Sequence, residues 1–248
     1  RLTRYHRTTI ETPKQLRGRM FQLYTLFFFT ENFSGKPPKS QYSRDIYTGG
    51  FMARHNRRYK DSVFVDLFGE DKNAKSNFLS LYNALHGTKL DASTELELLQ
   101  LEQVMYMAFR NDVAYLVDGK IIVLVEHQST VNANMPLRFL QYVARLYECI
   151  QNPRDRYLRR LKKIPTPEFY VFYNGEEDYP EKATLRFSDA FMAMSEKPAL
   201  ELVVSVTNIN YNKGSKILHT CKLLKEYTLF VEAVRRHTKL DSENGFKN

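Results

Sequence analysis

One stretch of the chain decides its fold: Asn111-Asp112-Val113-Ala114-Tyr115-Leu116-Val117-Asp118-Gly119-Lys120-Ile121-Ile122-Val123-Leu124-Val125-Glu126-His127-Gln128. Two apolar runs rich in β-branched residues, 113–117 and 121–125, flank Asp118-Gly119, a pattern that strongly favours a β-hairpin. Polar side chains frame this hairpin, because Asp112 precedes its first strand and Glu126 follows its second. Any chemistry should therefore lie at the open end of the hairpin.

Asp112 and Glu126 should converge there, because the entry to one strand and the exit from its antiparallel neighbour lie at the same edge of a sheet. A pair of carboxylates suits a hard cation such as Mg²⁺. Gln128 lies two residues beyond Glu126 and points to the same face, whereas His127 points to the other face and is expected to be packed. Spacing alone leaves an alternative open, that these are ordinary polar residues at strand ends.

The length of the hairpin loop tests this site. A strict two-residue loop would pair Asp112 with Val125 and place the two carboxylates on opposite faces. A three-residue loop, Val117-Asp118-Gly119 with Gly119 in the left-handed region, would pair Leu116 with Lys120 and restore a common face. We therefore predict an odd-length loop.

The rest of the chain predicts an α/β fold in which helices flank a mixed sheet. Apolar residues recur at helical spacing in three segments, and buried strands are expected in two others, with at least one more strand within 96–109. The expected helices are 72–85, 135–150 and 215–236, and the expected strands are 169–173 and 200–206.

Charged residues are distributed unevenly along the 248-residue chain. Residues 1–60 hold 13 Lys and Arg against 3 Asp and Glu, a net charge of +10, and the remainder carries 24 against 25. We expect residues 1–51 to be a basic extension, non-native or disordered, and 52–248 to be the folded domain. The two cysteines, Cys149 and Cys221, form no C-x-x-C motif, which fits free thiols in a reducing, cytoplasmic compartment. No apolar stretch is long enough to cross a membrane.

Three parts of the sequence together resemble the Rpn family of recombination-promoting nucleases, also described as YhgA-like transposases, within the PD-(D/E)XK nuclease superfamily. The first part is the hairpin and the segment after it, which contains Glu126-His127-Gln128-Ser129-Thr130 and Asn132-Ala133-Asn134-Met135-Pro136. The second part lies upstream and reads Asp66-Leu67-Phe68-Gly69-Glu70. The third lies downstream and reads Phe169-Tyr170-Val171-Phe172-Tyr173-Asn174-Gly175. The resemblance covers about 58–237. It implies a restriction-endonuclease-like core with element order αβββαβ, and family members usually continue beyond the point where this chain ends.

The resemblance also implies a metal-dependent DNA endonuclease that acts in recombination or transposition. Asp112 and Glu126 would hold Mg²⁺ or Mn²⁺, with the backbone carbonyl of His127 as a further ligand. Gln128 stands where the wider superfamily has a catalytic lysine, and an amide can orient water but brings no charge. The alternative is a catalytically weak or inactive DNA-binding accessory protein of a mobile element.

Basic residues outside the hairpin are candidates for binding DNA. Arg138 and Arg145 share one side of the 135–150 helix, where they either flank the metal site or are solvated arginines beside a core tyrosine. The segment 154–163 holds six basic residues, which either bind the DNA backbone or form a solvated helix face. Its strongest candidates are Arg159, Arg160, Lys162 and Lys163. DNA is thus the expected partner, no membrane is expected, and a homodimer is left open.

Overall fold

The computed structural model describes residues 63–100 and 112–245, with the side chains of the last helix described as far as Arg236. The described residues all lie in one compact unit. The predicted basic extension, 1–51, falls outside the described residues, as does most of the segment 96–109.

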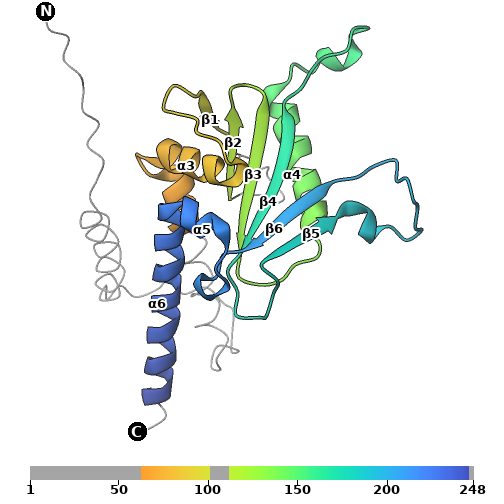
Figure 1. Cartoon of the computed structure of the whole chain (residues 1–248). Helices are drawn as coiled ribbons and strands as arrows, with labels where there is room; N and C mark the ends of the chain where they lie inside the picture. Colours follow the sequence, from red (N-terminus) through yellow and green to blue (C-terminus); the bar gives the residue numbers. More distant parts are fainter. Residues whose placement is uncertain (1–62, 101–111, 246–248) are drawn as a thin grey trace, which may run out of the picture. The chain divides into compact units, whose positions relative to one another are not determined.

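A six-stranded mixed sheet forms the centre of this unit, in the order β1-β2-β3-β4-β6-β5 (Figure 1). Its first three strands are antiparallel, β3, β4 and β6 run parallel, and β5 is antiparallel to β6. The strands are β1 (Leu96–Leu98), β2 (Val113–Val117), β3 (Ile121–Gln128), β4 (Thr166–Tyr173), β5 (Lys182–Arg186) and β6 (Val203–Asn208).

Helices cover both faces of the sheet. Helix α4 (Met135–Ile150) packs on one face, and α3 (Ala74–His86), α5 (Lys216–Thr220) and α6 (Lys222–Gly245) pack on the other with the π-helical turn η2 (Asp66–Glu70). The alternation along β3 creates these two cores, because Ile122 and Leu124 face α4 while Val123 and Val125 face α3 and α6. The fold is α/β, and the order α3-β1-β2-β3-α4-β4 is the αβββαβ order expected from the sequence.

The β2–β3 hairpin has the predicted odd-length loop. Val117 pairs with Ile121, so the loop is Asp118-Gly119-Lys120, and both Asp118 (φ 48°) and Gly119 (φ 63°) are left-handed. The predicted pairing of Leu116 with Lys120 is wrong, because Lys120 belongs to the loop and its carbonyl accepts a hydrogen bond from the Thr166 N–H at 2.8 Å. This register extends to Asp112 opposite Glu126 and gives them a common face.

The other elements follow the sequence closely. Helix α4 has the predicted bounds, and α3 ends at Gly87, whose φ of 66° closes the helix in the left-handed conformation. The predicted helix 215–236 is divided into α5 and α6 at Cys221, which has extended backbone. Strand β6 begins three residues later than predicted, and β5, an edge strand, was not predicted.

Two short 3₁₀ turns lie in the connections that carry the most exposed large apolar side chains of the described residues. They are η3 (Asp155–Tyr157), between α4 and β4, and η4 (Phe187–Ala190), between β5 and β6. None of the described helices is long and apolar enough to cross a membrane.

Candidate active site

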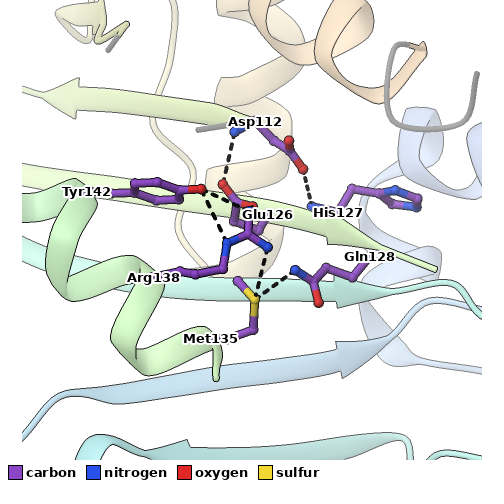
Figure 2. Close-up of polar contacts among 7 residues, drawn as sticks. All are labelled: Asp112, Glu126, His127, Gln128, Met135, Arg138 and Tyr142. Carbon is purple, nitrogen blue, oxygen red and sulfur yellow. Dashed lines mark hydrogen bonds and ion pairs between the residues drawn. The ribbon is translucent and has the colours of Figure 1, made fainter. Parts of the chain in front are cut away.

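Asp112 and Glu126 meet across the β2–β3 ladder. Glu126 Oε1 accepts a hydrogen bond from the backbone N–H of Asp112 at 3.0 Å, and Asp112 Oδ2 accepts one from the backbone N–H of His127 at 2.7 Å (Figure 2). Each carboxylate therefore binds the backbone of the opposite strand. The structure brings the two predicted acids together, on the face of the sheet that α4 covers.

A cation from α4 completes this arrangement. Arg138 Nη2 lies 2.8 Å from Glu126 Oε2, and the same nitrogen donates to the Tyr142 hydroxyl at 2.9 Å. Glu126 is only 2% exposed, whereas the Arg138 side chain is 37% exposed. Helix α4 positions this pair because Met135, Arg138 and Tyr142 recur at spacings of three and four and share one helix face. The ion pair therefore has a buried carboxylate and a guanidinium that solvent can reach.

Local charge and burial shift two pKa values in this cluster. Burial lowers the pKa of Arg138, but the neighbouring Glu126 carboxylate and the Tyr142 hydroxyl raise it, and the net shift is upward. Burial, followed by the charge of Glu126, raises the pKa of Tyr142. Arg138 is therefore a permanent cation at this site, and Tyr142 stays a neutral phenol.

Gln128 and His127 point to opposite faces, as predicted. The amide nitrogen of Gln128 donates to Met135 Sδ at 2.7 Å, at the start of α4, and none of the described residues donates a hydrogen bond to its amide oxygen. His127 is 4% exposed, stacks on Phe64 with ring centroids 5.3 Å apart, and its Nε2 lies 3.0 Å from the Tyr227 hydroxyl. Gln128 is thus beside the acids, and His127 is a packed core histidine.

Comparison with protein-family models yields a match to a family described as "Putative transposase, YhgA-like" over residues 59–211. The chain belongs to this family. The matched range holds the whole sheet, α4 and both carboxylates, and it ends before α5. Searches of curated proteins and of solved structures gave no match.

A metal at this YhgA-like site would depend on few protein ligands. Among the described residues, no group of three or more His, Cys, Asp or Glu side chains is arranged to hold a metal ion. Two carboxylates from adjacent strands nevertheless suit Mg²⁺, which keeps several waters and is bound through one or two carboxylates and the phosphates of its substrate. The donor set therefore fits a cation that is completed by water and substrate.

The candidate DNA-binding residues lie in three separate places. Arg138 is at the site, whereas Arg145 is two turns further along α4, exposed and paired with Glu148 at 2.8 Å. The connection between α4 and β4 places Arg159, Arg160, Lys162 and Lys163 at the opposite end of the sheet. That connection contains one 3₁₀ turn, η3, so it is not the solvated helix face considered from the sequence.

The sequence pattern did not identify two members of the cluster. Met135 contacts both the Gln128 amide nitrogen and, at 3.5 Å, the Arg138 guanidinium, and Tyr142 accepts hydrogen bonds from Arg138. The helical spacing of Met135, Arg138 and Tyr142 can be seen in the sequence, but such spacing is as typical of a helix face that packs in the core as of a functional site. Only the docking of α4 against the end of β3 separates the two interpretations.

Proposed function

We propose that this YhgA-like protein is a metal-dependent DNA endonuclease that acts in recombination or transposition. The observation that carries the proposal is the convergence of Asp112 and Glu126 from adjacent strands, at the edge where the parallel strands β3, β4 and β6 end. Ligands of open α/β sheets bind preferentially at the carboxyl ends of parallel strands. Because the family is described as a putative transposase, DNA is the substrate that we assign to this site.

Asp112 and Glu126 would hold Mg²⁺ or Mn²⁺. A bound divalent cation lowers the pKa of water and offsets negative charge on the phosphate. Glu126 is prepared for this role because its buried carboxylate is fixed by the Asp112 N–H and by Arg138, so little reorganisation is needed. The same contacts keep Asp112 close to the Glu126 carboxylate.

Arg138 supplies the fixed positive charge that Gln128 lacks. Its guanidinium is partly exposed and has a raised pKa, so it can contact a phosphate oxygen while it stays paired with Glu126. Gln128 orients water, since its amide nitrogen is held by Met135 and its amide oxygen can accept a hydrogen bond. This division of roles predicts a slower enzyme than one with a lysine at position 128.

The test is cleavage of supercoiled plasmid by the full chain with Mg²⁺, with Mn²⁺ and with EDTA. We expect metal-dependent nicking that Asp112→Ala and Glu126→Ala each abolish. Glu97→Gln, an exposed carboxylate on β1, is the control and should cut like the wild type. Equal nicking by the wild type and Glu126→Ala would show that the activity does not come from this site.

A second function, a DNA-binding accessory protein with a weak or inactive site, is favoured by one observation. The Arg138 guanidinium already neutralises Glu126, in the position where a metal ion would otherwise do so. In that case the wild type binds DNA in gel-shift assays but nicks no plasmid with either metal, and Glu126→Ala does not change its affinity for DNA.

A further inference from the structure

The connection between α4 and β4, here called the basic arm (residues 151–165), projects from the domain (Figure 1). Six of its residues are basic and all six are exposed. Only Lys162 has a carboxylate partner among the described residues, Asp155 at 3.1 Å. The other five carry uncompensated charge: Arg154, Arg156, Arg159, Arg160 and Lys163.

The basic arm also exposes large apolar side chains between its cations. Tyr157 is 82% exposed and Leu161 is 87% exposed, and the adjacent Leu158 and Ile164 are more than two-fifths exposed. Uncompensated cations interleaved with an exposed aromatic ring are the features with which proteins bind single-stranded nucleic acid, through phosphates and base stacking respectively. A duplex offers the phosphates but hides the faces of its bases.

Hydrogen bonds fix the point at which the basic arm joins the sheet. The arm leads into β4 beside the hairpin loop, where the Thr166 N–H donates to Lys120 O at 2.8 Å and the Tyr147 hydroxyl donates to Pro165 O at 2.7 Å. The carboxylates lie at the other end of β3, an eight-residue strand. Ile121, which pairs with Thr166 at the end of the arm, and Glu126 are five residues apart on β3. This is about 17 Å at the usual rise per residue, or about five nucleotides at duplex spacing.

We infer that the basic arm binds an unpaired stretch of DNA about five nucleotides from the site of Asp112 and Glu126. The arginines contact phosphates and Tyr157 stacks on a base. This inference rests on the proposed function for its choice of DNA, and it narrows the substrate to DNA with a single-stranded segment to one side of the cut. Such DNA occurs at frayed ends and branched intermediates.

The test measures binding without metal, so that cleavage is not needed. The full chain is titrated in EDTA against a labelled single-stranded oligonucleotide and against a duplex of the same sequence. Tyr157→Ala should weaken single-strand binding about five- to a hundredfold and duplex binding less than about twofold. The triple variant Arg156→Gln, Arg159→Gln, Arg160→Gln should reduce the slope of log affinity against log salt by about two.

The matched control is the triple variant Lys72→Gln, Lys75→Gln, Lys89→Gln, which removes three exposed cations from α3 and the segments on either side of it. None of the three pairs with a carboxylate of the described residues. It should leave affinity and salt slope nearly unchanged. Equal losses in the two triple variants, or no effect of Tyr157→Ala, would overturn the inference. So would arm variants that lose binding to phosphatidylserine vesicles while keeping their affinity for DNA.

The outcomes separate this inference from the proposed function. If the arm variants behave as expected and no metal-dependent nicking is found, the arm binds DNA and the endonuclease proposal fails. If nicking depends on Glu126 while the arm variants bind like the wild type, the endonuclease proposal stands and the arm has no part in DNA binding.

Discussion

Asp112 and Glu126 lie opposite each other across an antiparallel ladder, and the Glu126 carboxylate accepts the backbone N–H of Asp112 at 3.0 Å. A carboxylate that binds the backbone of its partner's strand is fixed in place without help from a ligand. The separation of the two acids therefore depends on the hairpin register, and the register depends on the loop Asp118-Gly119-Lys120. The chemistry of the site and the geometry of a distant turn are linked in this way.

Arg138→Gln should destabilise the protein unless a metal replaces the lost charge. Glu126 is 2% exposed and would lose its ion pair with Arg138, so the free energy of unfolding should fall by about 2 kcal/mol. Saturating Mg²⁺ should restore more stability to this variant than to the wild type. Urea unfolding with and without Mg²⁺ measures both effects.

Arg145→Gln is the control for that measurement. Arg145 forms an exposed pair with Glu148 on the same helix, and its loss should change stability by less than about 0.5 kcal/mol. An Arg138→Gln variant that is as stable as Arg145→Gln would mean that the ion pair with Glu126 contributes nothing to folding.

Gln128→Ala should separate water orientation from metal binding. We expect the cleavage rate to fall about ten- to a thousandfold, in the range for loss of one positioned hydrogen-bonding group, while Mg²⁺ affinity measured by calorimetry stays nearly constant. Gln128→Lys should raise the rate if the longer side chain reaches the phosphate. Gln141→Ala, exposed on α4, is the control. A large loss of Mg²⁺ affinity in Gln128→Ala would instead make Gln128 a ligand.

The sequence predicts the central elements well because their patterns are strong. The hairpin strands are two β-branched runs around Asp118-Gly119, and α4 has a proline in its first turn and a periodic apolar face. The prediction of two acids on one face also follows from local information, since strand parity and an odd loop are sufficient. The loop lies one residue later than predicted, so Leu116 pairs with Ile122 and not with Lys120, whose carbonyl accepts a hydrogen bond from Thr166, in a strand that follows α4.

What the sequence does not predict depends on contacts between distant elements. Strand β5 reads Lys-Ala-Thr-Leu-Arg, half exposed, and only pairing with β6 makes it a strand. The break between α5 and α6 at Cys221 involves neither Pro nor Gly. The ion pair of Arg138 with Glu126 joins a helix to a strand, and no spacing rule connects the two residues.

Gly119→Ala should destabilise the hairpin that sets this register. The φ of Gly119 is 63°, a conformation that costs a residue with a Cβ about 1–2 kcal/mol, so the free energy of unfolding should fall by that amount. Gly69→Ala is the control, since its Cβ would meet only ordinary contacts at 3.8 and 3.9 Å. Chemical denaturation of both variants measures the difference, and equal stabilities would show that the turn does not require glycine.

Tyr115→Phe should stabilise the protein, and more so at alkaline pH. The Tyr115 hydroxyl is buried and has no hydrogen-bond partner among the described residues, so its removal should add about 1 kcal/mol near neutrality. Burial raises the pKa of Tyr115 to about 12, against about 10 for an unfolded chain.

The sign of the pH effect follows from that upward shift. Below about pH 9 the contribution of this shift to stability is fully present. As pH rises above about 10 the unfolded state loses the Tyr115 proton first, so the wild type progressively loses on the order of 2 kcal/mol of stability by about pH 12. Other tyrosines with raised pKa values, such as Tyr142, affect both proteins alike. The stability difference between Tyr115→Phe and wild type, measured by urea unfolding, should therefore widen between about pH 9 and about pH 11. A difference that stays constant with pH would mean that Tyr115 ionises as easily in the folded protein as in the unfolded chain.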